Sequence, residues 1–229
     1  MKKFKYCMLS LPRSGSNWVR YWFEYFSHES TSEKNILVEK NHWGQLRTPT
    51  TPATLYKRHE LSNSELKLRE IKKLILVLRD YKECFVRHCI GKNFETRIER
   101  LKSYVDNLYL YDSFDGEKLI LHYEDFVLNT KEQMQTFLNF LKVKNDWESV
   151  NVDYHRNVSL NLYESGGLSH IGKQTRGSPS ITRGRSDFQF HQKRLCDETK
   201  KNLEDWFTLN HNSIYKKYLS RYNTSSLVF

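Results

Sequence analysis

The sequence predicts an α/β fold in which a mostly parallel central sheet is covered by helices on both faces. Residues 6–11 and 74–78 are short apolar runs, typical of strands that are buried on both faces. Segments such as 130–141 carry apolar residues at helical spacing. Strand and helix patterns alternate along the chain, which favours a parallel sheet. These patterns do not specify the order of the strands.

Composition limits the class of protein. The 229 residues, 38% of them hydrophobic, suit one domain that spans residues 1–229. The net charge of +10 indicates an anionic partner, which is a nucleic acid, a membrane surface or a polyanionic small molecule. No two of the four cysteines form a C-x-x-C pair, so we expect reduced thiols and a cytoplasmic protein. Each apolar run is too short for a signal peptide, and we expect no membrane span.

The first half of the chain predicts a strand, a loop and a helix within residues 4–28. Pro12 ends the strand, and Trp18, Trp22 and Phe26 lie on one stripe of the helix. The polar segment 28–34 is predicted to be a loop, 36–38 a short strand, and the proline-containing segment 41–52 a surface loop or lid. A strand at 53–57 and a helix at 64–73, capped by Ser62 or Ser64, follow.

The second half begins with the buried strand 74–78. Helices are predicted at 82–91 and 94–111, a strand at 118–123, and a helix with a threonine cap at 130–141. Residues 145–190 are basic and rich in glycine, which favours a flap that closes over an anion, with a solvated tail as the alternative. Closing helices are expected at 192–207 and 213–222.

The loop after the first strand has the composition of an anion site. Ser14, Gly15 and Ser16 can expose consecutive backbone N–H groups at a helix N-terminus, and Arg13 adds a cation. An ordinary strand-to-helix turn with serine caps is the alternative. The loop lacks the G-x-x-x-x-G-K-S/T pattern of a Walker A loop, which counts against an ATPase or GTPase.

Basic residues also follow two further strands. Lys57, Arg58 and His59 end the strand at 53–57, and Arg79 follows the strand at 74–78. Ligands of open α/β sheets bind outside the carboxyl ends of the strands, so Arg13 and Arg79 are expected to face one crevice. The alternatives are a solvated basic turn at 57–60 and, for Arg79, an ion pair with Asp80 or a helix cap.

Taken in order, these motifs resemble the sulfotransferases that use 3′-phosphoadenosine 5′-phosphosulfate (PAPS). Residues 12–18 (PRSGSNW) resemble the 5′-phosphosulfate loop, P-K/R-S-G-S/T-S/T-W, and 55–59 (LYKRH) resemble the strand that ends in K-T/S-H. Residues 76–80 (LVLRD) resemble the strand that opens the 3′-phosphate site, 121–126 (LHYEDF) resemble Y-E-D-L, and 183–188 (RGRSDF) resemble the R-K-G-x-x-G-D-W flap. The resemblance implies a three-layer fold like that of P-loop NTPases and a single sulfotransferase domain.

The resemblance also implies roles for residues of the reaction centre. His59 would take the proton from the acceptor hydroxyl or amine, and Lys57 would lie near the transferring group. Arg13 would offset charge on the leaving oxygen. The 5′-phosphate and the sulfuryl group would be held by Arg13 and by the N–H groups of Ser14, Gly15, Ser16 and Asn17.

The nucleotide contacts follow from the same resemblance. Trp18 would pack on the adenine, Tyr123 would lie by its edge, and Arg79 would bind the 3′-phosphate. The flap residues Arg183, Gly184 and Arg185 would help Arg79. The chain departs from the family at Asn17, where a hydroxyl residue is common, and at Arg87, where serine is frequent; an arginine there would bind the 3′-phosphate more strongly.

The expected function is in-line transfer of a sulfuryl group from PAPS to a hydroxyl or amine, with adenosine 3′,5′-bisphosphate (PAP) as product. No metal and no nucleic-acid partner are expected, and no membrane span. The acceptor is a small molecule, a carbohydrate or a peptide, and the sequence does not choose among them or specify an oligomeric state. The alternatives are a P-loop-like nucleotide kinase or NTPase and a non-enzymatic, basic nucleic-acid-binding module.

Overall fold

The computed structural model describes residues 3–27, 30–31, 53–89, 94–143, 150–151, 193 and 195–223. Its sheet has the order β2-β3-β1-β4-β5, and every neighbouring pair is parallel. The strands are β1 (Tyr6–Ser10), β2 (Ser30–Thr31), β3 (Ala53–Arg58), β4 (Lys73–Leu78) and β5 (Glu117–His122). The α/β fold with a parallel sheet is therefore confirmed, and the carboxyl ends of all five strands lie at one edge.

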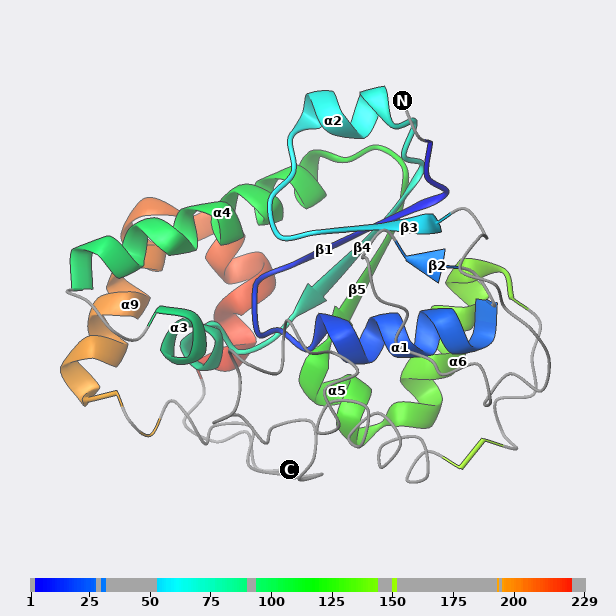
Figure 1. Cartoon of the computed structure of the whole chain (residues 1–229). Helices are drawn as coiled ribbons and strands as arrows, with labels where there is room; N and C mark the ends of the chain where they lie inside the picture. The colour runs from blue at the N-terminus through cyan, green and yellow to red at the C-terminus, as the bar shows by residue number, and fades with distance from the viewer. Residues whose placement is uncertain are drawn as a thin grey trace.

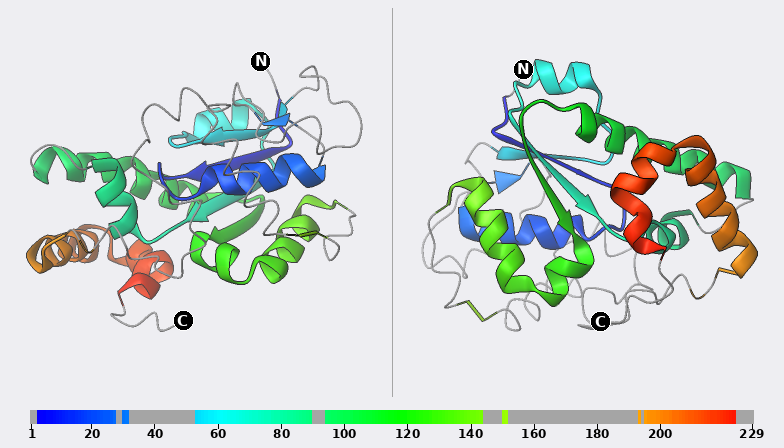
Figure 2. Two further views of the ribbon diagram at one scale, coloured as in Figure 1. Left: turned by 60° about the horizontal axis from the view of Figure 1, so that its bottom comes forward. Right: turned by 180° about the vertical axis from the view of Figure 1, so that it is seen from behind.

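Helices cover both faces of this sheet. Figures 1 and 2 show α1, α5 and α6 on one face and α2 and α4 on the other. The helical segments are α1 (Ser16–Ser27), α2 (Asn63–Leu68), α3 (Tyr81–Cys89), α4 (Phe94–Ser113), α5 (Tyr123–Leu128), α6 (Thr130–Leu141), α9 (Asp197–Asn210), α10 (Asn212–Ile214), the π-helix η4 (Tyr215–Leu219) and the 3₁₀-helix η5 (Ser220–Tyr222).

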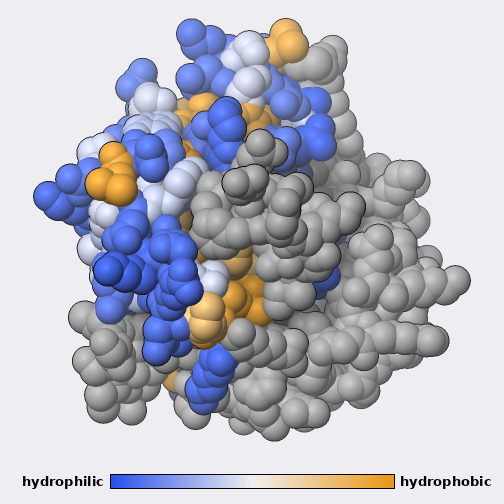
Figure 3. All heavy atoms as spheres, turned by 90° about the vertical axis from the view of Figure 1, so that its left-hand side faces the viewer, coloured by the Kyte–Doolittle hydropathy of each residue, from blue (hydrophilic) through white to orange (hydrophobic). Residues whose placement is uncertain are grey.

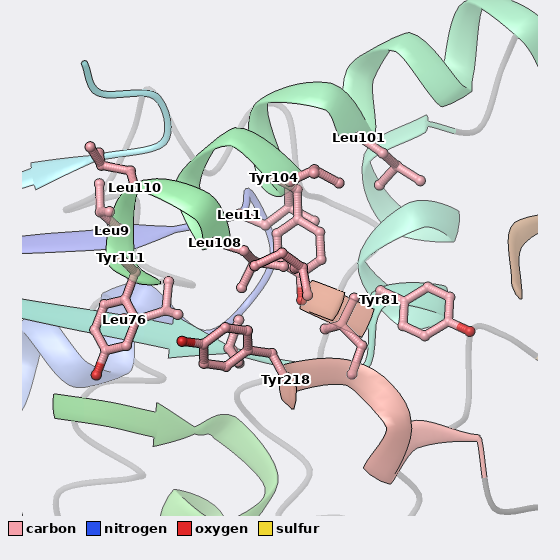
Figure 4. Packing of buried hydrophobic residues seen from close by; sticks show 14 of the residues in the cluster. Leu9, Leu11, Leu76, Tyr81, Leu101, Tyr104, Leu108, Leu110, Tyr111 and Tyr218 are labelled. Atoms are coloured by element: carbon pink, nitrogen blue, oxygen red, sulfur yellow. The ribbon is translucent and has the colours of Figure 1, made fainter. Parts of the chain in front are cut away.

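The alternation of side chains along β1 creates the layers. Tyr6 and Met8 pack in the cluster that includes α1 and α6, whereas Cys7 and Leu9 pack in the cluster that includes α4. Figure 4 shows residues of the second cluster, with Leu9 and Leu76 of the strands beside α4. Because both faces of the strand are covered, an uninterrupted apolar run is stable there.

Two elements differ from the expectation because tertiary contacts decide them. Ser30–Thr31 lies in the segment predicted to be a loop, yet it pairs with β3 as an edge strand. Helix α2 ends at Leu68, well before the predicted end at residue 73, since Glu70 takes a left-handed φ of 55° and Ile71 turns into the core. The Ser62 cap is confirmed, and its Oγ accepts the N–H of Glu65 at 3.2 Å.

The region around β5 also corrects the prediction. Tyr123 begins α5 instead of ending the strand, and α5 was not predicted. The threonine cap of α6 was wrong, because the N-cap residue is Asn129 and the Thr130 hydroxyl donates back to the carbonyl of Phe126 at 3.1 Å. The predicted strand 36–38 and loop 41–52 lie outside the described residues, as does all of the predicted flap 145–190 except residues 150–151.

The C-terminal segment, residues 215–223, ties several elements together. Arg221 pairs with Asp125 of α5 through two hydrogen bonds of 2.8 and 2.9 Å. Lys82 Nζ of α3 donates to the carbonyl of Tyr222 at 2.7 Å. The Tyr222 hydroxyl lies 3.0 Å from Nδ1 of His122 at the end of β5. The last described residues of the chain therefore support the carboxyl edge of the sheet.

Figure 3 shows hydrophilic residues dominating the described part of the face that it presents. Among the described helices, no segment combines the length and apolar character that a membrane crossing requires.

Truncation of a buried strand leucine tests this core. Leu74 of β4 is fully buried, so we expect Leu74→Ala to lower the free energy of unfolding by about 2–5 kcal/mol. Leu209 on α9 is 82% exposed, and the same change there should alter stability by less than about 0.5 kcal/mol. Urea unfolding of both variants measures the difference, and equal effects would contradict this placement of β4.

The partial burial of His122 predicts a dependence of stability on pH. Burial lowers its pKa from 6.5 to about 4, and the nearby Arg221 acts in the same direction. The unfolded state therefore binds more protons between these values, so stability is complete above pH 6.5 and falls as the pH drops towards 4. We expect His122→Gln to remove about 2–3 kcal/mol of this dependence, measured by urea unfolding at pH 7.5 and pH 4.5. An identical pH dependence in both proteins would contradict a half-buried histidine that is neutral in the folded state.

Candidate functional site

The loop between β1 and α1 turns tightly through left-handed backbone. Arg13 has a φ of 76° and Gly15 a φ of 86°. For a residue with a side chain, such as Arg13, this conformation costs about 1–2 kcal/mol, and it is concentrated at functional sites. The N–H of Ser14 donates to the carbonyl of Leu11 at 3.1 Å and closes the turn.

The N-terminus of α1 presents unused donors. Its first intrahelical bond runs from the N–H of Trp18 to the carbonyl of Gly15 at 2.9 Å. Within the described residues, the N–H groups of Gly15, Ser16 and Asn17 donate no hydrogen bond, and the buried Ser14 hydroxyl has no partner. Free N–H groups and the helix dipole favour an anion at this position. The N–H of Ser14, which was expected to join them, is engaged in the turn.

Gly15 lies directly against the ring of Tyr123. A Cβ atom at Gly15 would lie 2.1 Å from Cδ2 of Tyr123, closer than any real contact allows. Tyr123 is the first residue of α5 and is buried. The contact and the positive φ together restrict this position to glycine.

Arg79 continues the site at the end of β4. It is only 5% exposed, and its guanidinium lies 4.4 Å from the centre of the Tyr123 ring. One of its terminal nitrogens donates to the carbonyl of Arg13 at 3.4 Å, whereas Nε has no partner among the described residues. A buried cation with an unused donor, beside the loop and helix N-terminus, forms a second position for an anion.

The ion pair of Arg79 differs from the one considered from the sequence. Its partner is the buried Glu83, one turn along α3, at 3.8 Å. Asp80 instead accepts the N–H of Lys82 at 2.9 Å and caps α3. Sequence reasoning missed Glu83, although its i,i+4 spacing from Arg79 is a signal that it could have used.

His59 follows β3 and is oriented by the end of β1. Its Nδ1 lies 2.6 Å from the carbonyl oxygen of Ser10, which can only accept, so Nδ1 carries the proton of the neutral ring. Nε2 then holds the lone pair, and Lys57 Nζ lies 3.1 Å from it. The ring therefore presents a basic nitrogen beside a cation.

Two neighbours of His59 were not predicted. Ser10 contacts the ring through its carbonyl and, at 3.2 Å, through its hydroxyl. Asn107 of α4 donates its side-chain N–H to the carbonyl of His59 at 2.5 Å. Parallel pairing of two strand ends is a signal for Ser10, but nothing local in the sequence marks Asn107.

Arg58 lies apart from this site because strand residues alternate in direction. Its Nε donates to the Tyr56 hydroxyl at 2.5 Å, and its guanidinium lies 3.7 Å from Glu65. The predicted crowding of three cations at this strand end therefore reduces to Lys57 beside the neutral ring of His59.

The remaining predicted residues have these positions. Trp18 is 4% exposed and packs edge-on against Trp22 with ring centres 5.0 Å apart. Asn17 accepts a hydrogen bond from Arg20 at 3.4 Å. Arg87 lies in α3, but its side chain is outside what the structure describes, as are Arg183, Gly184 and Arg185. The nucleotide contacts assigned to these residues stay predictions.

The alternatives to the predicted site are a metal centre and a hollow elsewhere in the described residues. Among the described residues, no three His, Cys, Asp or Glu side chains gather in a cluster that would hold a metal ion. A shallow hollow of about 360 Å³ lies between residues 61–63 and α4, and it contains none of the predicted site residues. The carboxyl edge of the sheet is therefore the candidate site.

Solved structures share this fold at low sequence identity. Mouse sulfotransferase SULT7A1, complexed with PAP, matches with a TM-score of 0.61 and 16% identity over 99% of this chain and 90% of its own. A retinol dehydratase in complex with androsterone and the inactive cofactor PAP matches with a TM-score of 0.56 and 14% identity over 94% of this chain and 82% of its own. The sulfotransferase domain of the Synechococcus PCC 7002 olefin synthase matches with a TM-score of 0.50 and 16% identity over 89% of this chain and 96% of its own.

These matches show that the chain has a sulfotransferase fold. No protein-family model and no curated protein match the sequence. One of the similar structures is named a dehydratase, so this fold alone does not specify the reaction.

The contact between Gly15 and Tyr123 gives a test of this geometry. Gly15→Ala forces a Cβ atom into the Tyr123 ring at a left-handed φ, and we expect it to lower stability by about 2–5 kcal/mol. In the Tyr123→Ala background the steric part disappears, so the added cost of Gly15→Ala should fall to about 1–2 kcal/mol. Thermal unfolding of the two single variants and the double variant measures this coupling. Strictly additive effects would show that the two residues do not touch.

Proposed function

We propose that this chain, as a single domain, transfers a sulfuryl group from PAPS to a hydroxyl or amine acceptor and releases PAP. One observation carries the proposal. The segment 10–17 contacts His59 through Ser10, Arg79 through the Arg13 carbonyl and Tyr123 through Gly15. The proposed base and the two positions suited to anions therefore lie around the loop after β1 and the N-terminus of α1.

The residues present fit the donor nucleotide. The free N–H groups of Gly15, Ser16 and Asn17, with the Ser14 hydroxyl, suit the 5′-phosphate. The unused Nε of Arg79 suits the 3′-phosphate, and the adjacent Tyr123 suits a position at the edge of the adenine. We assign the side chain of Arg13 to the sulfuryl end, Trp18 to the adenine, and Arg87, Arg183, Gly184 and Arg185 to supplementary phosphate contacts, in agreement with the sequence motifs.

The proposed reaction is a single in-line displacement. Nε2 of His59 takes the proton of the acceptor O–H or N–H group, and the freed electron pair forms the new bond to sulfur. The bond between sulfur and the bridging oxygen of the 5′-phosphate breaks, and its electrons leave with PAP. Lys57 and Arg13 offset the charge on the transferring group and on the leaving oxygen. A general base of this kind contributes about 10²–10⁴-fold.

Two features of the chain support the choice of donor and a cytoplasmic location. The loop lacks the Lys-Ser/Thr pair of a Walker A motif, which argues against a triphosphate substrate. Cys7 and Cys84 are free thiols, which suits a cytoplasmic protein. The acceptor is a small molecule, a carbohydrate or a peptide.

The separation of base and anion sites can be tested with three variants. His59→Ala should lower kcat about 10²–10⁴-fold and leave the Kd for PAP unchanged, because the base does not contact the nucleotide. Arg13→Ala should also lower kcat, and Arg58→Ala, which removes the neighbouring cation that lies apart from the site, should not. PAP release from PAPS, measured by mass spectrometry with a panel of phenols, sugars and peptides, provides the rate. Full activity of both His59→Ala and Arg13→Ala would overturn the proposal.

A further inference from the structure

Glu124 is a buried carboxylate that the proposed reaction does not use. It follows Tyr123 in α5 and is 1% exposed. Its Oε1 accepts the backbone N–H of Asp80 at 3.0 Å. Its Oε2 accepts the hydroxyl of Tyr222 at 3.3 Å. A carboxylate at this depth is costly unless it is hydrogen-bonded, and burial raises the pKa of Glu124.

The first of these bonds fixes the turn that carries Arg79. Asp80 is the residue after Arg79, and its own carboxylate accepts the N–H of Lys82. The turn from β4 into α3 is thus held at two points. The backbone N–H of Asp80 binds Glu124, and the Asp80 carboxylate caps the N-terminus of α3. The guanidinium of Arg79 lies over Tyr123, the residue before Glu124. Loss of the Glu124 carboxylate would leave the Asp80 N–H buried without an acceptor and release this turn.

The second bond brings in the C-terminal segment, residues 215–223. The Tyr222 hydroxyl lies between Glu124 and Nδ1 of His122. Tyr222 is itself held by Lys82 Nζ on its carbonyl, and its neighbour Arg221 pairs with Asp125. Tyr222, about 100 residues from Glu124 in sequence, therefore binds the carboxylate that fixes the turn after Arg79.

We propose that Glu124, held by Tyr222, is a positioning residue for Arg79, so that the C-terminal segment sets the preference of the site for a nucleotide with a 3′-phosphate. The inference rests on the proposed function, which assigns Arg79 to that phosphate. Glu124 does not touch the nucleotide in this account. It acts through the backbone of Asp80.

The test compares PAP with adenosine 5′-monophosphate (AMP), which lacks only the 3′-phosphate. The readout is the ratio of the two Kd values from isothermal titration calorimetry. Glu124→Leu removes the acceptor for the Asp80 N–H and should lower the preference for PAP about tenfold or more. Glu124→Gln retains an oxygen acceptor and should keep the preference within about threefold of the wild type.

A matched pair of tyrosine variants covers the case in which Glu124→Leu does not fold. Tyr222→Phe removes only the hydroxyl bound to Glu124 and should lower the preference about three- to tenfold. Tyr218→Phe makes the same chemical change in the same segment, where the hydroxyl donates to Asp112 at 2.6 Å, and should leave the ratio unchanged.

The outcomes separate this inference from the proposed function. A wild-type protein that binds AMP as tightly as PAP would overturn the assignment of the nucleotide, and with it both proposals. A wild-type preference for PAP that is unchanged in Tyr222→Phe, and in Glu124→Leu where it folds, would overturn only the role of Glu124. Equal weakening of PAP and AMP would show that Glu124 serves the stability of the fold and does not position Arg79.

Discussion

The close approach of Gly15 to the Tyr123 ring is the constraint on which the candidate site depends. It presses the loop after β1 onto the start of α5 and leaves no room for a side chain. Tyr123 in turn lies under Arg79, and Arg79 reaches back to the carbonyl of Arg13. These contacts connect the residues that follow β1, β4 and β5 at the carboxyl edge of the parallel sheet. Ligands of such folds bind at this edge.

The charges at this edge are arranged around buried hydrogen bonds. Arg79 and Glu83 are both buried, and a carboxylate on the next turn offsets part of the cost of burying the guanidinium. Nε of Arg79 and the Ser14 hydroxyl remain without partners in the described structure, beside the free N–H groups of α1. Unpaired buried donors are costly, which is the physical reason to expect an anion that binds them. On the other side of the loop, Ser10 fixes the tautomer of His59.

The sequence predicted what local patterns determine. The apolar runs at 6–11 and 74–78 located β1 and β4, and Arg13, His59, Arg79 and Tyr123 follow the carboxyl ends of β1, β3, β4 and β5, at the edge where the site was predicted. What it missed depends on contacts between distant segments: β2 exists through pairing with β3, and Asn107 reaches His59 from α4. Arg58 lies apart from Lys57 and His59 because strand residues alternate in direction, a signal that the prediction of three crowded cations did not use. The predicted flap, apart from residues 150–151, lies outside the residues that the structure describes.

The central claim is that this edge binds a 3′,5′-bisphosphorylated nucleotide, with its 5′ end on the loop before α1 and its 3′-phosphate on Arg79. A crystal structure of the complex with PAP tests it most directly. The account predicts the 5′-phosphate within hydrogen-bonding distance of the N–H groups of Gly15, Ser16 and Asn17, and the 3′-phosphate on the guanidinium of Arg79. Density for PAP at another surface, or in the reversed orientation with the 3′-phosphate on the loop, would contradict it.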